Sequence, residues 1–171
     1  MAGDRPQIRA YTGLMRIYYP VLARELEEGI FPLRQAYCVR PDCTLRGEDL
    51  EVVEDDARTL AALDSLALLR EEETGALSRC IIAADIDGLS WEEYDNDVAQ
   101  TSVCAPAEDS IAAYFIDHPD ATPLVLDVIG AQTQEEADDA VAQLWEESME
   151  WYAPEERDLV VRVLCSMCAQ S

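Results

Sequence analysis

The stretch Arg79-Cys-Ile-Ile-Ala-Ala-Asp85 is an almost continuous apolar run with a charged residue at each end. It has the length of one strand, and runs of this kind are typical of strands that are buried on both faces of a sheet. We therefore predict that residues 79–85 form the centre of the sheet. The segments on either side decide what pairs with this strand and what covers it.

Two further strands are predicted on the N-terminal side of residues 79–85. Residues 15–19 form a short apolar and aromatic run that ends at Pro20, and residues 35–40 form another that ends at Pro41. Proline cannot donate a ladder hydrogen bond, so it is typical of a strand end.

Two helices are predicted between these strands. Apolar residues recur at a helical period over 20–29 and again over 49–73, and acidic residues begin the second helix, where the helix dipole favours negative charge. A right-handed crossover through 49–73 would make the strands at 35–40 and 79–85 parallel.

The second half of the chain changes from strands to helices near residue 120. Residues 88–97 are predicted to be a polar and aromatic loop, because polar residues make up most of the segment. Strands are expected over 98–104 and 110–117. Helices follow at 123–130, at 133–149 and from 154 onward.

The predicted order is therefore strand-helix-strand-helix-strand-strand-strand-helix-helix-helix. This order predicts an α/β fold, with α+β as the alternative, in which helices pack on a single mixed sheet of about five strands. We expect one globular domain over residues 15–171. Residues 1–14 lack a clear period and are expected to be an N-terminal extension.

The charge of the chain is strongly negative. It has 36 acidic residues against 12 basic ones, all of them arginine, which gives a formal net charge of -24. Residues 80–156 carry twenty acidic residues and no Lys or Arg. Such a surface repels nucleic-acid phosphates and anionic lipids, so we expect no direct nucleic-acid binding and no membrane association. It would attract a basic protein partner, unless the charge serves only solubility.

The sequence favours a non-catalytic, acidic protein-interaction module. An aromatic anchor surrounded by carboxylates would suit a basic partner. In the alternative interpretation, Trp91 and Tyr94 fold back and cap the sheet. The residues that we predict to form the interaction surface are Trp91, Glu92, Glu93, Tyr94, Asp95 and Asp97.

A small enzyme that uses carboxylates is the second functional class. The only histidine, His118, follows a strand in a His-Pro-Asp sequence and is interpreted as a turn residue. Close acid pairs such as Asp85 and Asp87 are expected by chance at this acid content. No catalytic residue is predicted, but an anionic substrate could be bound by Arg16, Arg34 or Arg79.

A cysteine-bound metal is the third class. Cys165 and Cys168 form a C-x-x-C pair, and Cys38 with Cys43 could complete four zinc ligands. The pair lies at the end of a predicted helix, where the dipole disfavours a thiolate, so we expect reduced thiols with no bound metal. No glycine-rich phosphate loop is present, and no cofactor is predicted. No signal peptide or transmembrane run is recognised, which predicts a cytoplasmic protein.

Six segments form an ordered series along the chain: Met15–Pro20, Gln35–Val39, Leu50–Leu69, Cys80–Asp85, Ile111–Asp117 and Trp151–Glu156. This series resembles an uncharacterised family of small actinobacterial proteins, a domain of unknown function whose members begin Met-Arg-Ile-Tyr-x-Pro. The resemblance runs from about residue 15 to 160 and implies a bacterial, cytoplasmic α/β protein without an assigned activity; the cysteines are not part of the pattern.

Overall fold

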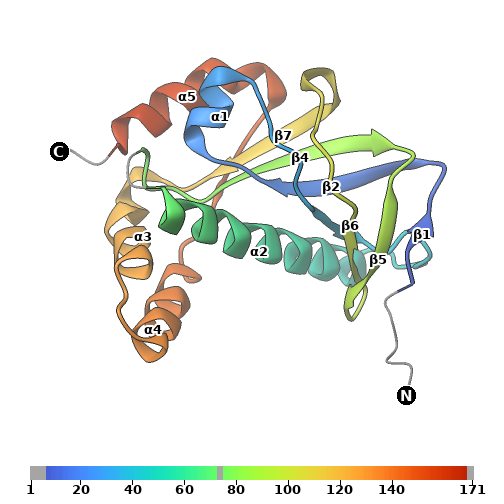
Figure 1. Ribbon diagram of the computed structural model, residues 1–171, viewed down its shortest axis with the longest axis horizontal. Coiled ribbons are helices and arrows are strands. Elements are labelled where there is room, and N and C mark those ends of the chain that lie inside the picture. Colours follow the sequence, from blue (N-terminus) through green and yellow to red (C-terminus); the bar gives the residue numbers. More distant parts are fainter. Residues whose placement is uncertain (1–6, 73–74, 169–171) are drawn as a thin grey trace.

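The predicted central strand is β4, which lies inside an antiparallel sheet (Figure 1). The computed structural model describes residues 7–72 and 75–168. Within these residues the sheet has eight strands in the order β1-β5-β6-β3-β2-β4-β7-β8. The strands are β1 (Arg9–Ala10), β2 (Leu14–Pro20), β3 (Tyr37–Val39), β4 (Cys80–Asp87), β5 (Ser90–Asp95), β6 (Val98–Thr101), β7 (Ile111–Ile116) and β8 (Glu150–Tyr152).

The sheet differs from the prediction in size and in pairing. It has eight strands instead of about five, and every neighbouring pair is antiparallel, so it is not a mixed sheet. The strands β3 and β4 do run in the same direction, because both pair antiparallel with β2, which lies between them. The connection from β3 through α2 to β4 therefore passes over β2, which lies between the two strands.

The unpredicted strands are the two edges and β5. The segment predicted as a loop over 88–97 forms β5 and a tight turn into β6, in which Asn96 has a φ of 49°. Asparagine tolerates this left-handed conformation better than most residues, which suits a hairpin turn. Of residues 1–14, expected as an extension, residues 1–6 lie outside the described ranges, and Arg9–Ala10 form β1, which pairs with β5.

The helices form a layer on each face of the sheet (Figure 1). Helix α2 crosses one face, α1 and α5 cover the other, and α3 and α4 lie at one end of α2. None of the helices in the described ranges is long and apolar enough to cross a membrane. The bounds are α1 (Ala23–Glu28), α2 (Glu48–Glu71), α3 (Thr122–Ile129), α4 (Gln134–Leu144) and α5 (Arg157–Ser166), with short 3₁₀ turns at Glu108–Ser110, Pro119–Ala121 and Pro154–Glu156.

Small residues let α2 lie close to the sheet. Ala57 and Ala61 are fully buried and pack with Tyr18, Ile81 and Ala83, which come from β2 and β4. The opposite face of the same strands buries larger side chains against α1 and α5. Alternation along each strand therefore separates two apolar cores, as expected for a sheet with both faces covered.

Candidate functional site

The predicted interaction residues lie on β5 and on the turn that follows it. Trp91 is only 3% exposed and belongs to the core, so it cannot act as an exposed anchor. The guanidinium carbons of Arg9 and Arg40 lie 5.3 and 6.0 Å from its ring centroid. The Glu93 carboxylate lies 2.9 Å from Arg40 and 3.7 Å from Arg9. Two arginines from distant parts of the chain therefore neutralise much of the charge expected here.

The other residues of this group do not form one surface. Tyr94 is about half exposed, and its ring packs edge-on against Tyr37 at a centroid distance of 5.3 Å. Asp97 accepts a hydrogen bond from the Cys43 thiol at 3.4 Å. Glu92 is partly buried and Asp95 is exposed. Of these six residues only Trp91 is buried, and the others are partly or fully exposed.

The three arginines that could bind an anionic substrate in the enzyme hypothesis each already bind a carboxylate. Both oxygens of the partner carboxylate accept hydrogen bonds in all three cases. Such two-point pairs use the planar fork of the guanidinium, which leaves it little capacity for another anion. The pairs are Arg16 with Asp85, Arg34 with Glu25, and Arg79 with Asp117, each with a shortest N–O distance of 2.6 Å.

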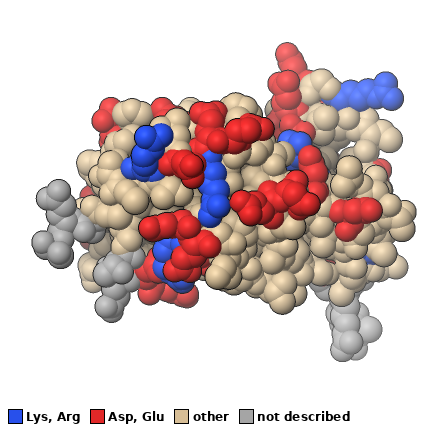
Figure 2. Space-filling model, turned by 90° about the horizontal axis from the view of Figure 1, so that it is seen from above, with Lys and Arg blue, Asp and Glu red and all other residues tan. Residues whose placement is uncertain are grey.

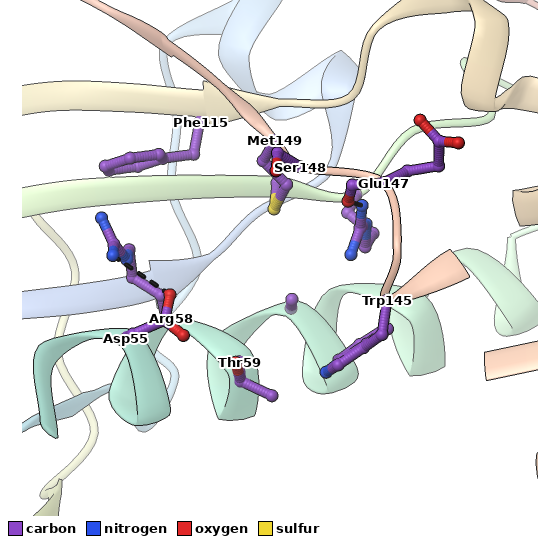
Figure 3. A pocket seen from close by; sticks show the side chains of 10 residues that line it. Asp55, Arg58, Thr59, Phe115, Trp145, Glu147, Ser148 and Met149 are labelled. Atoms are coloured by element: carbon purple, nitrogen blue, oxygen red, sulfur yellow. Dashed lines mark hydrogen bonds and ion pairs between the residues drawn. The ribbon is translucent and has the colours of Figure 1, made fainter. Parts of the chain in front are cut away.

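A cleft of about 350 Å³ lies between α2 and the end of the sheet formed by β7 and the segment leading into β8 (Figure 3). Arg58 and Asp55 lie at one end of it, beside Phe115, and Trp145 lies at the other. The Arg58 guanidinium lies 5.2 Å from the centroid of Phe115 and 3.2 Å from Asp55. The cleft is therefore lined by two aromatic rings together with polar and charged groups.

Arg79 lines this cleft and forms a buried ion pair with Asp117 behind it. The Arg79 guanidinium lies 5.1 Å from the centroid of the Trp145 ring and donates a hydrogen bond of 2.8 Å to the carbonyl oxygen of Glu147. Asp117 is fully buried and the Arg79 side chain is 5% exposed. This ion pair therefore fixes the turn between α4 and β8 against the sheet.

Strand β8 forms the edge of the sheet beside the cleft. Its central residue Trp151 is 59% exposed and pairs in register with Phe115, so both side chains lie on the α2 side of the sheet. Tyr152 packs against the α5 side and donates a hydrogen bond of 2.9 Å to Glu150. The sequence placed Trp151 beside the last helix but did not predict this strand, because three residues are too few to show a period.

The acidic residues of α4 remain without arginine partners within the described ranges. Eight described arginines form ion pairs with carboxylates, and none of these carboxylates lies on α4. Figure 2, which looks onto the side of α1 and α5, shows the contrasting arrangement, in which basic groups lie beside acidic ones. The α4 acidic face, as we call it, consists of Glu135, Asp138, Asp139 and Glu146, all exposed and spaced to lie along one side of the helix and its end.

The other candidate residues, His118 and the cysteines, do not form a site. His118 accepts a hydrogen bond from the backbone of Asp120 and caps a 3₁₀ turn, which confirms it as a turn residue. Within the part of the chain that the structure describes, no three His, Cys, Asp or Glu side chains are placed to hold a metal ion. Cys38 and Cys43 therefore do not assemble a site with Cys165 and Cys168. Burial raises the pKa of Cys38 to about 12, which keeps this thiol protonated.

Comparisons with known proteins identify a family without a function. The model of a family of unknown function, DUF6912, matches residues 15–161, which includes all of α1 to α4 and most of the sheet. No curated protein and no solved structure matches the chain. The geometry of the chain itself therefore has to carry any functional argument.

Proposed function

The chain belongs to the family of unknown function DUF6912, and from its geometry we propose that it is a non-catalytic, acidic protein-interaction module whose α4 acidic face binds a basic protein. The observation that carries this proposal is the isolation of that face. Its four carboxylates have no ion-pair partner among the described residues, and α4 itself carries no Lys or Arg, whereas α2 carries Arg58, which pairs with Asp55, and Arg70.

The carboxylates of the α4 acidic face repel each other, although Glu135 lies in the first turn of the helix, where the dipole favours it, and Asp138 accepts a hydrogen bond from Gln134. Like charges three or four residues apart on a helix repel each other by a few tenths of a kcal/mol per pair. Asp138 and Asp139 both lie within that spacing of Glu135. A basic partner would relieve this repulsion on binding, so the cost has a reason if the face is a contact surface.

The position of α4 also favours contact with a partner. The helix packs mainly on α3, and its buried residue is Leu144, while the acidic residues point to solvent. No Lys or Arg occurs between Arg79 and Arg157, so no basic residue of this segment interrupts the negative potential near the face. Complementary potentials of this kind accelerate and orient the encounter of two proteins.

Charge-neutral variants of two helices test the proposal. The α4-neutral variant carries Glu135→Gln, Asp138→Asn, Asp139→Asn and Glu146→Gln. The matched α2-neutral variant carries Glu48→Gln, Asp49→Asn, Glu51→Gln and Asp56→Asn, which removes the same charge from exposed positions elsewhere. Each tagged protein is used to capture proteins from lysate of the native organism at low and high salt, and retained proteins are identified by mass spectrometry.

The proposal expects a basic protein that the wild type and the α2-neutral variant retain at low salt and release at high salt, and that the α4-neutral variant fails to retain. Equal retention by both variants would show that only total charge matters and would reject α4 as the contact surface. Circular dichroism verifies that each variant is folded, so that a failure to retain the partner cannot be attributed to unfolding.

A further inference from the structure

The free edge of β8 is the second unusual surface of the molecule. It is the last strand in the sheet order, and its outward backbone groups form no hydrogen bond within the described ranges. Unpaired N–H and C=O groups at a sheet edge are a template for a strand from another chain. The opposite edge, β1, has only two residues and is a smaller template.

Trp151 gives this edge an apolar anchor. It is 59% exposed, and its register with Phe115 places it on the side of the sheet that carries the cleft. Tryptophan is enriched among the few residues that supply most of the binding free energy at protein interfaces. A side chain from an added strand, placed opposite Trp151, would contact the indole and extend toward the aromatic lining of the cleft.

The charges around β8 select a basic strand. Glu150 lies on the opposite side of the strand from Trp151, and neither Glu147 nor Glu155, on either side of β8 in the chain, forms an ion pair with a described residue. A residue of the added strand that lies opposite Glu150 would have its side chain on the same face, where a positive charge is favoured. Residues one position away would face Trp151.

We propose that β8 binds an extended segment of the partner by strand addition, and that this segment alternates basic residues, which face Glu150, with apolar residues, which face Trp151. This inference rests on the proposed function and deepens it, because it specifies the chemistry of the partner segment. The α4 acidic face attracts basic chains in general, whereas the edge of β8 selects among them by the order of their residues.

Two peptides of equal composition test the proposal. The first is a fluorescently labelled, capped peptide Lys-Val-Lys-Val-Lys-Val-Lys, and the second is its block isomer Lys-Lys-Lys-Lys-Val-Val-Val. Binding to the full-length protein is measured by fluorescence anisotropy at low salt. Since the peptides carry the same charge, a difference in affinity reports the alternation that a strand requires. We expect the alternating peptide to bind about tenfold more tightly.

Variants of the two sheet edges locate the binding. Trp151→Ala should weaken binding of the alternating peptide about tenfold, to the level of the block peptide, and Trp151→Tyr should retain most of the affinity because it keeps an aromatic face. The control Ile8→Ala truncates an exposed apolar side chain next to the opposite edge, at β1, and should change neither affinity. Circular dichroism verifies that each variant is folded.

Equal affinities for the two peptides, unchanged by Trp151→Ala, would overturn strand addition. The α4 proposal would survive that result if the α4-neutral variant weakens binding of both peptides equally. In another outcome, the α4-neutral variant binds both peptides as tightly as the wild type, while Trp151→Ala no longer binds the alternating peptide more tightly than the block peptide. That outcome would support the β8 site and count against the α4 acidic face.

Discussion

The ion pair between Arg79 and Asp117 links the sheet to the cleft wall. Asp117 accepts hydrogen bonds from the backbone N–H of Arg79 and from its guanidinium, and the guanidinium also reaches the carbonyl of Glu147. A charge that is buried this completely is tolerated only because its partner is present. This arginine therefore has a structural role and is not free to bind a substrate.

Removing the negative partner should destabilise the protein strongly. We expect Asp117→Asn to lower the free energy of unfolding by about 3–5 kcal/mol, because it leaves the Arg79 charge buried without compensation. Urea denaturation followed by circular dichroism measures this change. The matched variant Asp109→Asn removes an exposed carboxylate and should change the free energy by less than about 0.5 kcal/mol. A loss below about 1 kcal/mol for Asp117→Asn would contradict the structural role.

Asp64 makes a pH-dependent contribution to stability. Burial raises the pKa of this carboxyl above its ordinary value of 3.8, although the hydroxyl of Tyr37 donates a hydrogen bond to it at 2.8 Å. The folded state therefore holds this proton more tightly than the unfolded state does. The stability that the protonated Asp64 adds to the folded state is fully present below pH 3.8 and is lost as the pH rises through the raised pKa.

The variant Asp64→Asn cannot lose this proton. Its free energy of unfolding, relative to that of the wild type, should increase as the pH rises from about 4 to 7, and then stay constant. Urea unfolding curves for both proteins across this range measure the difference. A difference that is independent of pH would show that the Asp64 pKa is the same in the folded and unfolded states.

Among the helices and strands, the sequence predicts those whose apolar pattern is long and is set by neighbouring residues. The strand at 79–85 and the helix at 49–73 are recognisable because each shows its period over many residues, and both were found within two residues of the predicted limits. Strand β5 was missed because its segment is rich in acidic residues, one of which, Glu93, binds Arg9 and Arg40, which lie far away in the sequence. The edge strands β1 and β8 were missed because they are too short to show a period.

The candidate site was missed for the same reasons. The interaction hypothesis placed Trp91 at the surface and the alternative placed it against the sheet; the structure buries it in the core, where it is 3% exposed. Trp151, by contrast, is exposed only because β8 ends the sheet, which the sequence does not reveal. The absence of basic residues from 80–156 was visible from the sequence, but only the ion pairs show that the charge persists on α4.

The close packing of α2 on the sheet gives a prediction at this scale. Ala61 is fully buried between the helix and the strands, so Ala61→Leu should overpack this contact and lower the free energy of unfolding by about 1–3 kcal/mol. The control Ala67→Leu makes the same change at an exposed position of the same helix and should be nearly neutral. Thermal unfolding of both variants measures the effect; equal melting temperatures would mean that α2 does not pack closely at Ala61.

For the whole molecule, the net charge of -24 is a source of self-repulsion. The unpaired carboxylates of α4 add to it, while the arginines hold together the sheet and its edges. Repulsion between exposed charges is screened as salt concentration rises, because the Debye length falls from about 30 Å at 0.01 M to about 8 Å at 0.15 M. The stability of the protein should therefore depend on salt.

We expect the melting temperature of the wild type to rise by about 3 °C between 20 and 300 mM sodium chloride, which corresponds to roughly 1 kcal/mol. The α4-neutral variant has a net charge of -24 + 4 = -20 and should show a smaller rise. Differential scanning calorimetry measures both values. A melting temperature that falls with salt would show that the attractive ion pairs, and not the repulsion, dominate the electrostatics of the fold.

The central claim is that the α4 acidic face binds a basic protein. The most direct measurement is the dissociation constant of the purified captured partner, obtained by isothermal titration calorimetry at 50 and 300 mM salt for the wild type and for the two neutral variants. We predict that the α4-neutral variant binds about tenfold more weakly at 50 mM salt and loses most of the salt dependence, while the α2-neutral variant binds like the wild type. Equal dissociation constants and equal salt dependence for the two variants would contradict the claim.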